Sequence, residues 1–354
     1  MVSLEQMRAS NARIPRSLPP GLVAVFVGGT SGIGETTMKK FAKHTVQPRI
    51  YFIGRSEQSA IRILAELQTL NPAGEYQFLQ ADVSLLQNVD HVCREIYTKE
   101  KLVNLLFLTC GTMVTGQETV EALYYPTAVT YYARIRFIAN LLPLLQKASA
   151  LRRVVSVYGG TKEGLLDPSN FPGCYIPPDA HPRQARAHLS AMTTLALESL
   201  ALEAPDVSFV HAFPGCVRTN LGRDVRRCRR GRGAGMRGLL AKVRVVGASV
   251  GALPVAEAGE RQLFLATSAR FPARDGVDVA LTSGVRLRDD DGVSVARGSD
   301  GLEGSGVYSV GFDGEAGGPK VEELLRRLRG EDLVRRVWVH TVAEFIRVTG
   351  SEFV

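Results

Sequence analysis

The sequence contains few cysteines, and they form no pattern that would bind a metal or staple a small fold. Five cysteines are scattered over 354 residues, an odd number, and no two of them stand in a C-x-x-C pair. This arrangement argues against a disulfide framework and against a zinc site, and it favours a reducing compartment. Tryptophan is scarcer still, since Trp338 is the single one in the chain.

Long apolar runs are missing as well. No uncharged apolar run reaches the roughly 18 residues that suggest a membrane-spanning helix, and the best candidate, residues 239–255, contains Lys242 and Arg244. The amino-terminal segment has no continuous apolar core, so it is not a secretory signal. We therefore expect no membrane span and a cytoplasmic protein.

The positive charge of the chain lies in one segment. The formal net charge is +8, and residues 223–244 hold nine basic residues against one acidic residue, Asp224. This segment could bind an anionic substrate or an anionic lipid surface, or it could be a solvated arginine-rich loop. The sequence has neither the ligand spacing of a zinc site nor an RNA-binding aromatic signature, so no specific nucleic-acid partner is expected.

The chain does contain a regular alternation of apolar strands and helices. Ser56 predicts the start of one helix as its N-cap. Six alternations with short connections predict a doubly wound parallel sheet with helices on both faces. The predicted strands are 22–29, 49–55, 76–83, 103–111, 152–160 and 207–215, and the helices between them are 34–45, 56–72, 84–100, 119–148 and 183–204.

The carboxyl-terminal part is less regular. A returning helix is expected over 258–268, loops over 282–320 with a short hairpin within 307–315, and terminal helices that break at Gly330. The predicted organisation is an N-terminal segment (1–20), a dinucleotide-binding domain (21–283) and a C-terminal extension (284–354). The domain includes a basic substrate loop at about 221–256.

A glycine-rich loop joins the first strand to the first helix of the predicted sheet. Gly28 permits a tight turn, Gly32 lets the backbone approach a pyrophosphate, and Gly34 lets helix and strand pack closely. The unpaired N–H groups at the start of the following helix would then face the phosphates. We predict a dinucleotide site that includes Ser31 and Ile33; the alternative is a merely structural glycine turn.

This loop, with its sequence SGIGE, resembles that of the short-chain dehydrogenase/reductase family, and the resemblance covers roughly residues 20–283. Further matches fall in the family's order, and the chain looks most like a fungal branch often found in secondary-metabolite pathways. The resemblance implies an adenine contact at Asp82, a cofactor contact at Gly111 in LTCG, and a Pro214-Gly215 loop in which Thr219 holds the nicotinamide amide.

The second strand bears on the choice of cofactor. An acidic residue at its end would bind the ribose 2′-hydroxyl and repel a 2′-phosphate. This chain has Arg55 there, whose guanidinium suits a phosphate dianion. NADP(H) is therefore favoured over NAD(H), unless Arg55 is an ordinary solvated residue.

The catalytic pattern departs from the family. The resemblance implies a tyrosine and a lysine at positions 183 and 187, yet the chain has Arg183 and Ala187 there. A Y-x-x-x-K pair stands instead at Tyr158 and Lys162, where the family places its serine, and Thr130 replaces the family's asparagine. We take Tyr158 and Lys162 as the candidate catalytic residues.

Three interpretations of this departure remain open. Tyr158 and Lys162 work from a new position; or water, Tyr175 or His188 donates the proton; or the protein binds NADP without redox turnover, in a cyclase-like or scaffolding role. We expect an NADP(H)-dependent oxidoreductase acting on a hydrophobic carbonyl or alcohol in secondary metabolism. A homodimer is compatible with the sequence, because the tyrosines of the 119–148 helix would pack either in the core or between subunits.

Overall fold

The computed structural model describes residues 1–176, 182–221, 252–275 and 279–354. The arginine-rich segment 223–244, for which the sequence left several roles open, lies outside the described residues. Among the described residues, no helix is both long and apolar enough to cross a membrane.

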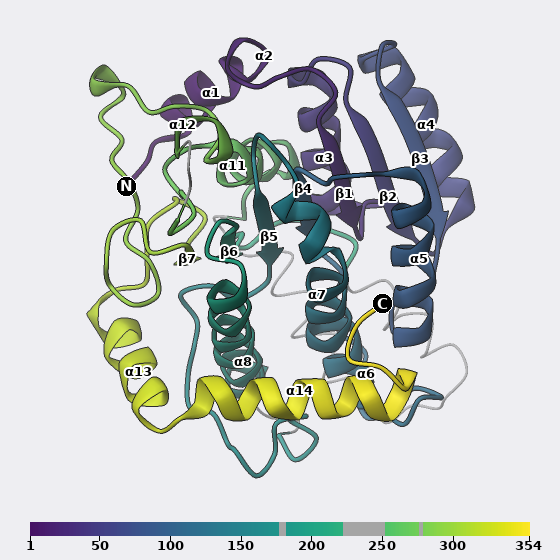
Figure 1. The fold of residues 1–354 in the computed structure, drawn as a ribbon, viewed down its shortest axis with the longest axis vertical. Coiled ribbons are helices and arrows are strands. Elements are labelled where there is room, and N and C mark those ends of the chain that lie inside the picture. The colour runs from purple at the N-terminus through teal and green to yellow at the C-terminus, as the bar shows by residue number, and fades with distance from the viewer. Residues whose placement is uncertain (177–181, 222–251, 276–278) are drawn as a thin grey trace.

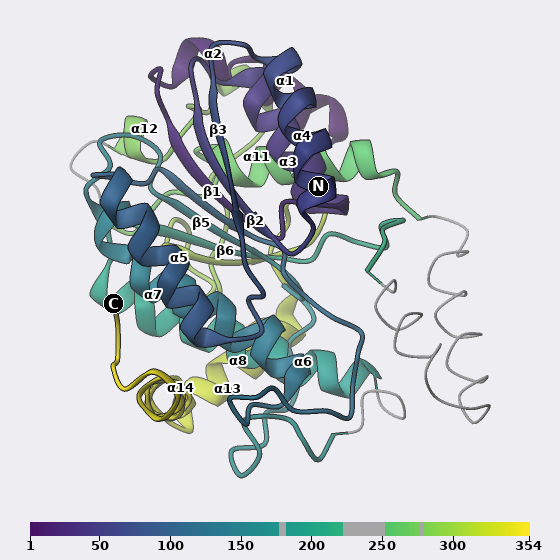
Figure 2. The same ribbon diagram turned by 90° about the vertical axis from the view of Figure 1, so that its right-hand side faces the viewer.

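A seven-stranded sheet with every pair of neighbours parallel forms the centre of the molecule (Figures 1 and 2). The order is β3-β2-β1-β4-β5-β6-β7, so the chain reverses its direction across the sheet between β1 and β4. In such sheets, ligands bind where the strand order reverses, outside the carboxyl ends of the strands. The strands are β1 Val23–Val27, β2 Arg49–Gly54, β3 Glu75–Gln80, β4 Leu105–Leu108, β5 Arg153–Val157, β6 Ser208–Ala212 and β7 Val307–Val310.

Helices cover both faces of the sheet, as Figure 2 shows. One core layer lies under α1, α3, α4 and α11, and the other lies under α5, α7, α8 and α14. The first group is α1 Leu4–Ala12, α3 Gly32–His44, α4 Glu57–Leu70 and α11 Val255–Thr267. The second is α5 Leu86–Lys99, α7 Ala133–Gln146, α8 Pro182–Glu203 and α14 Leu333–Thr349.

The doubly wound α/β class predicted from the alternating pattern is confirmed, with two differences in detail. The segment expected to form a hairpin is mainly strand β7, which pairs in parallel with β6. The Gly/Asp-rich turn after it resembles a hairpin turn, but only one antiparallel bridge, Val310 to Ala316, forms there. The helix expected from residue 119 starts at α6 (Tyr125–Thr127), because a turn held by the Thr119 hydroxyl precedes it.

The C-terminal extension packs against the main domain. The predicted break at Gly330 separates α13 (Pro319–Gly330) from α14, which crosses α8 and the end of α5 (Figure 1). Between α6 and α7, a π-helical segment over Ala128–Tyr132 carries Tyr131 and Tyr132. Their hydroxyls bond Thr341 and His340 of α14 at 2.6 and 2.7 Å, so these two tyrosines belong to the core of this chain.

Three further short helical segments lie within the described residues. They are α2 Ile14–Ser17, α12 Val279–Thr282 and a 3-10 turn over Asp289–Asp291. Helix α1 begins with a capping box at Ser3, and its Asn11 side chain donates to Glu260 of α11. The amino-terminal segment therefore packs on the same helical layer as α3.

Candidate functional site

A cleft of about 620 Å³ opens over the ends of β1, β2, β4 and β5, where the strand order reverses. Of the predicted site residues, the structure leaves Lys162 and Gly215 outside the set that lines this cleft. It brings together Gly28, Ser31, Gly32, Ile33, Gly34, Arg55, Asp82, Gly111, Tyr158, Pro214 and Thr219.

The glycine loop fits a diphosphate because side chains are sterically excluded from it. Gly28 has a φ of +86°, and a Cβ there would lie 2.8 Å from Thr109 Oγ1. A Cβ on Gly34 would lie 2.4 Å from the Gly28 carbonyl oxygen, so helix and strand meet closely at this point. Helix α3 starts at Gly32 without a side-chain cap from Ser31. The N–H groups of its first turn are therefore available to an anion.

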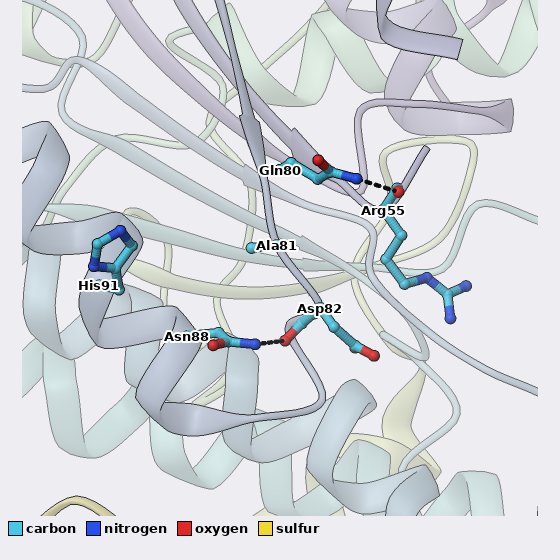
Figure 3. Close-up of a pocket in the computed structure, with 6 residues that line it drawn as sticks. All are labelled: Arg55, Gln80, Ala81, Asp82, Asn88 and His91. Carbon is cyan, nitrogen blue, oxygen red and sulfur yellow. Dashed lines mark hydrogen bonds between the residues drawn. The ribbon is translucent and has the colours of Figure 1, made fainter. Parts of the chain in front are cut away.

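A smaller cavity of about 390 Å³ adjoins the cleft and shares Arg55, Ala81 and Asp82 with it (Figure 3). Gln80 donates its side-chain amide to the Arg55 carbonyl at 3.2 Å, and Asn88 donates to the Asp82 carbonyl at 3.0 Å. The first bond joins the end of β3 to the loop after β2, and the second joins the loop after β3 to α5. Arg55 itself follows β2 directly, and no carboxylate lies between Gly54 and the helix cap at Ser56.

Tyr158 follows β5 directly and lines the inner end of the cleft. Its ring stacks on His211, with centroids 6.4 Å apart and planes 8° from parallel, and the Arg134 guanidinium carbon lies 5.8 Å from its centroid. Burial raises the pKa of Tyr158 to about 12, although the charges of Arg134 and Arg186 lower it in part. The phenol is therefore neutral near pH 7, and its oxygen makes no hydrogen bond within the described residues.

Known proteins resemble this chain over nearly its whole length. The family model described as short chain dehydrogenase matches residues 22–149. Oxidoreductase AN1596 of Emericella nidulans is 38% identical over 343 residues, which cover 96% of this chain and 97% of that relative. Short-chain dehydrogenase/reductase SAT2 of Stachybotrys chartarum is 30% identical and covers 97% of this chain and 96% of its own length. The chain belongs to the short-chain dehydrogenase/reductase family.

These two relatives confirm the expected likeness to fungal members. A third relative, oxidoreductase andH of Emericella variicolor, is 36% identical, and the match covers 99% of both chains. This short-chain dehydrogenase/reductase is thus an oxidoreductase of that type. Solved structures share its fold: L-sorbose reductase from Gluconobacter frateurii, complexed with NADPH and L-sorbose, is 16% identical with a TM-score of 0.50. It covers 76% of this chain and 98% of its own.

The resemblance implies a tyrosine and a lysine on α8, but this short-chain dehydrogenase/reductase has other residues at those two positions. Arg183 is exposed near the start of α8. Ala187 packs against the loop after β5, since a Cβ on Gly164 would lie 2.6 Å from the Ala187 methyl group. The Gly164 N–H also donates to the Ala187 carbonyl at 3.1 Å. This loop therefore contacts the helix at the position where the family's lysine would project.

His188 and Tyr175, the other two proton donors that the sequence allows, lie outside the cleft lining. His188 is buried, its Nε2 lies 3.1 Å from the Phe171 carbonyl, and its Nδ1 accepts from the Asp167 N–H at 3.4 Å. Burial lowers the pKa of His188, which keeps the ring neutral. Tyr175 is 84% exposed. Neither residue lines the cleft, whereas Thr130, at the position of the family's asparagine, does.

Lys162 is separated from the Tyr158 hydroxyl by the local backbone. Thr161 has a φ of +63° and the Lys162 N–H closes a turn on the Gly159 carbonyl at 3.0 Å, so the segment is not helical. The four-residue spacing therefore does not place the two side chains side by side. The Lys162 ammonium instead lies 4.9 Å from the centroid of the Phe213 ring.

Arg134 is a component of the cleft that the sequence argument missed. It is 1% exposed, and it lines the cleft from the first turn of α7. Its guanidinium donates to the Cys110 carbonyl at 3.1 Å, the Leu108 carbonyl at 3.0 Å and the Ser156 hydroxyl at 2.9 Å. Burial lowers its pKa. The available signal was an arginine inside an apolar helix, since a buried charge requires specific partners.

Proposed function

We propose that this chain is a cytoplasmic NADP(H)-dependent oxidoreductase that reduces a carbonyl, or oxidises the alcohol, of a hydrophobic small molecule in secondary-metabolite biosynthesis. The observation that carries the proposal is a single cleft containing both the glycine loop and the Tyr158 side chain. The fungal relatives named oxidoreductases support the reaction class.

The cofactor assignment rests on the residues along the cleft. The N–H groups at the start of α3 would hold the diphosphate, Arg55 the 2′-phosphate, and Thr219 the nicotinamide amide. The missing side chains at Gly28 and Gly34 leave the backbone open to this approach. The similar L-sorbose reductase was solved with NADPH. When bound, NADPH supplies the hydride.

The neutral phenol of Tyr158 suits reduction better than oxidation. Its pKa of about 12 keeps the proton on the oxygen at neutral pH, so the hydroxyl can donate to a carbonyl oxygen. An alkoxide produced by reduction is more basic than a phenolate, so the proton moves from Tyr158 to the product. Oxidation of an alcohol would need the phenolate, which is scarce at neutral pH.

The proposal is tested by titrating the protein with NADPH and with NADH while following the fluorescence of the reduced nicotinamide. NADPH is expected to bind more tightly, and Arg55→Asp should weaken NADPH binding by about tenfold or more, because a charged hydrogen bond contributes about 1.5–3 kcal/mol. Arg94→Asp, an exposed arginine on α5, serves as the control. If neither NADPH nor NADH binds, the proposal loses its basis.

A second function is favoured by one observation, the absence of the family's tyrosine and lysine from α8. The alternative is a cofactor-binding protein without redox turnover, cyclase-like or scaffolding. The two are separated by incubating the protein with NADPH and a panel of hydrophobic ketones. Consumption of NADPH supports the reductase, whereas tight NADPH binding without consumption supports the alternative.

A further inference from the structure

Three basic side chains surround two aromatic rings: Tyr158, which lines the inner end of the cleft, and Phe213, which lies outside the cleft lining and directly precedes the lining residue Pro214. The Lys162 ammonium lies 4.9 Å and the Arg186 guanidinium carbon 5.6 Å from the centroid of Phe213, and Arg134 lies 5.8 Å from that of Tyr158. All three fall within the roughly 6 Å over which a cation is attracted to a ring face. Within the described residues, none of the three forms an ion pair.

Two of these cations have hydrogen-bond donors to spare. Arg134 uses all three of its nitrogens on carbonyl and hydroxyl oxygens. Arg186, in contrast, has a buried Nε without a hydrogen-bond partner, although its side chain passes beside Gly159. Lys162 makes no side-chain hydrogen bond within the described residues. A buried donor left unpaired costs free energy, so this arrangement favours an acceptor that arrives with a ligand.

Within the described residues, no carboxylate pairs with these three cations. Glu163, the neighbour of Lys162 in the chain, accepts from the hydroxyls of Thr194 and Ser309, and burial raises its pKa, which favours the neutral acid. Burial lowers the pKa of His211 to about 3, so that ring stays neutral as well. Burial also raises the pKa of the Cys110 thiol. The region around Phe213 and Tyr158, at the border of the cleft, is therefore positive near pH 7 and attracts anions.

We propose that the substrate of the oxidoreductase function proposed above carries a carboxylate, and that Lys162 and Arg186 bind it beside Phe213. A guanidinium and an ammonium together match a carboxylate, which can accept several charge-assisted hydrogen bonds. The face of the Phe213 ring offers apolar contact to the rest of the molecule. Phe213 is followed by Pro214, which lines the same cleft as Tyr158, so a substrate whose carboxylate lies beside Phe213 would extend into the cleft that holds the phenol.

The test compares binding of keto acids with binding of their uncharged esters. Phenylglyoxylate and benzoylpropionate, each beside its methyl ester, are titrated by calorimetry into the protein alone and into the protein with NADP+, which cannot reduce a ketone. We expect at least one acid to bind about tenfold or more tightly than its ester, the range of hydrogen bonds to charged groups. Lys162→Met and Arg186→Met should each reduce this ratio, mainly by weakening the acid.

Arg183→Met is the matched control, because it removes the same charge from the exposed face of α8 and should leave the ratio unchanged. Equal or undetectable binding of acids and esters overturns the inference, as does a ratio that persists in both test variants. A loss of NADP+ affinity in those variants with an unchanged ratio would assign the two cations to the cofactor and also overturn it. The readout needs no turnover, so a failure of hydride transfer is scored separately, against the proposed function.

Discussion

At the scale of single residues, Tyr158 decides whether the chain can do proton chemistry from the end of β5. Replacing it with phenylalanine removes the hydroxyl and keeps the ring that stacks on His211. We expect Tyr158→Phe to lower the rate of ketone reduction by about 10²–10⁴-fold, the usual contribution of a positioned acid. NADPH binding should stay within about twofold of the parent value, which fluorescence titration checks. An unchanged reduction rate would eliminate Tyr158 as the proton donor.

The raised pKa of Tyr158 also predicts opposite pH responses in the two directions. Below a pKa of about 12 the phenol is protonated, so the donor needed for reduction is fully present. The phenolate needed for oxidation is a minor species whose fraction rises tenfold with each pH unit. Between about pH 7 and pH 10, kcat/KM for the alcohol should therefore climb while kcat/KM for the ketone does not. A flat oxidation profile would contradict this assignment.

At the scale of elements, His211 connects the strand ends that hold the site. The Gly159 N–H donates to its Nε2 at 3.0 Å, so the proton sits on Nδ1, which donates to Thr194 of α8. Thr194 and Ser309 of β7 then donate to Glu163. The network thereby joins the end of β5 to β6, α8 and β7, and protonation of His211 would break it.

This network predicts a loss of stability in acid. The folded-state pKa of His211 is lowered to about 3, whereas the unfolded chain binds that proton near pH 6.5, so stability is full above 6.5 and falls as pH drops toward 3. Each pH unit in this window costs about 1.4 kcal/mol for this one group. Urea unfolding at several pH values should show a shallower loss in His211→Gln than in the parent. Exposed His91→Gln is the control, and equal slopes in all three proteins would contradict the prediction.

The sequence predicted the elements whose signals are local and missed contacts made between distant segments. Runs such as Val23–Val27 read as buried strands because every residue of the run is apolar, and Ser56 marked a helix start by its own side chain. The sequence predicts a hairpin at strand β7, because its partner β6 lies almost a hundred residues away and the turn beside it is glycine-rich. The role of Arg134 on α7 could not be predicted either, since its partners are carbonyls at and just beyond the end of β4.

For the candidate site too, only the positions set by local order could be predicted from the sequence. The glycine loop, Arg55 and Asp82 could be placed at the sheet edge, because the order of strand, loop and helix fixes their position there. Tyr158 could be placed at the end of β5 from the sequence. The turn at Thr161, with a φ of +63°, could not be predicted from the sequence, so neither could the position of Lys162 relative to Tyr158. Whether Tyr158 and Lys162 are catalytic stays a prediction.

At the scale of the whole molecule, α14 covers the tyrosines of the predicted 119–148 helix, for which the sequence allows a place either in the core or at a subunit interface. It bonds the hydroxyls of Tyr131 and Tyr132, and the buried Arg136–Asp90 pair on α7 and α5 also reaches carbonyls of the last residues. A homodimer stays a prediction, but the surface of these two tyrosines is already occupied by the chain's own carboxyl terminus. The C-terminal extension should therefore contribute to the stability of the domain that holds the cleft.

This contribution can be measured with one substitution in α14. Phe345 is fully buried, and the Arg136 guanidinium carbon lies 5.0 Å from its ring centroid, so Phe345→Ala leaves a cavity beside a buried ion pair. We expect a loss of about 3–5 kcal/mol in the free energy of unfolding by urea. Val339→Ala on the same helix, at a position 58% exposed, should change it by less than about 0.5 kcal/mol. If α14 were only loosely attached, the two variants would unfold alike, and the extension would then be dispensable to the main domain.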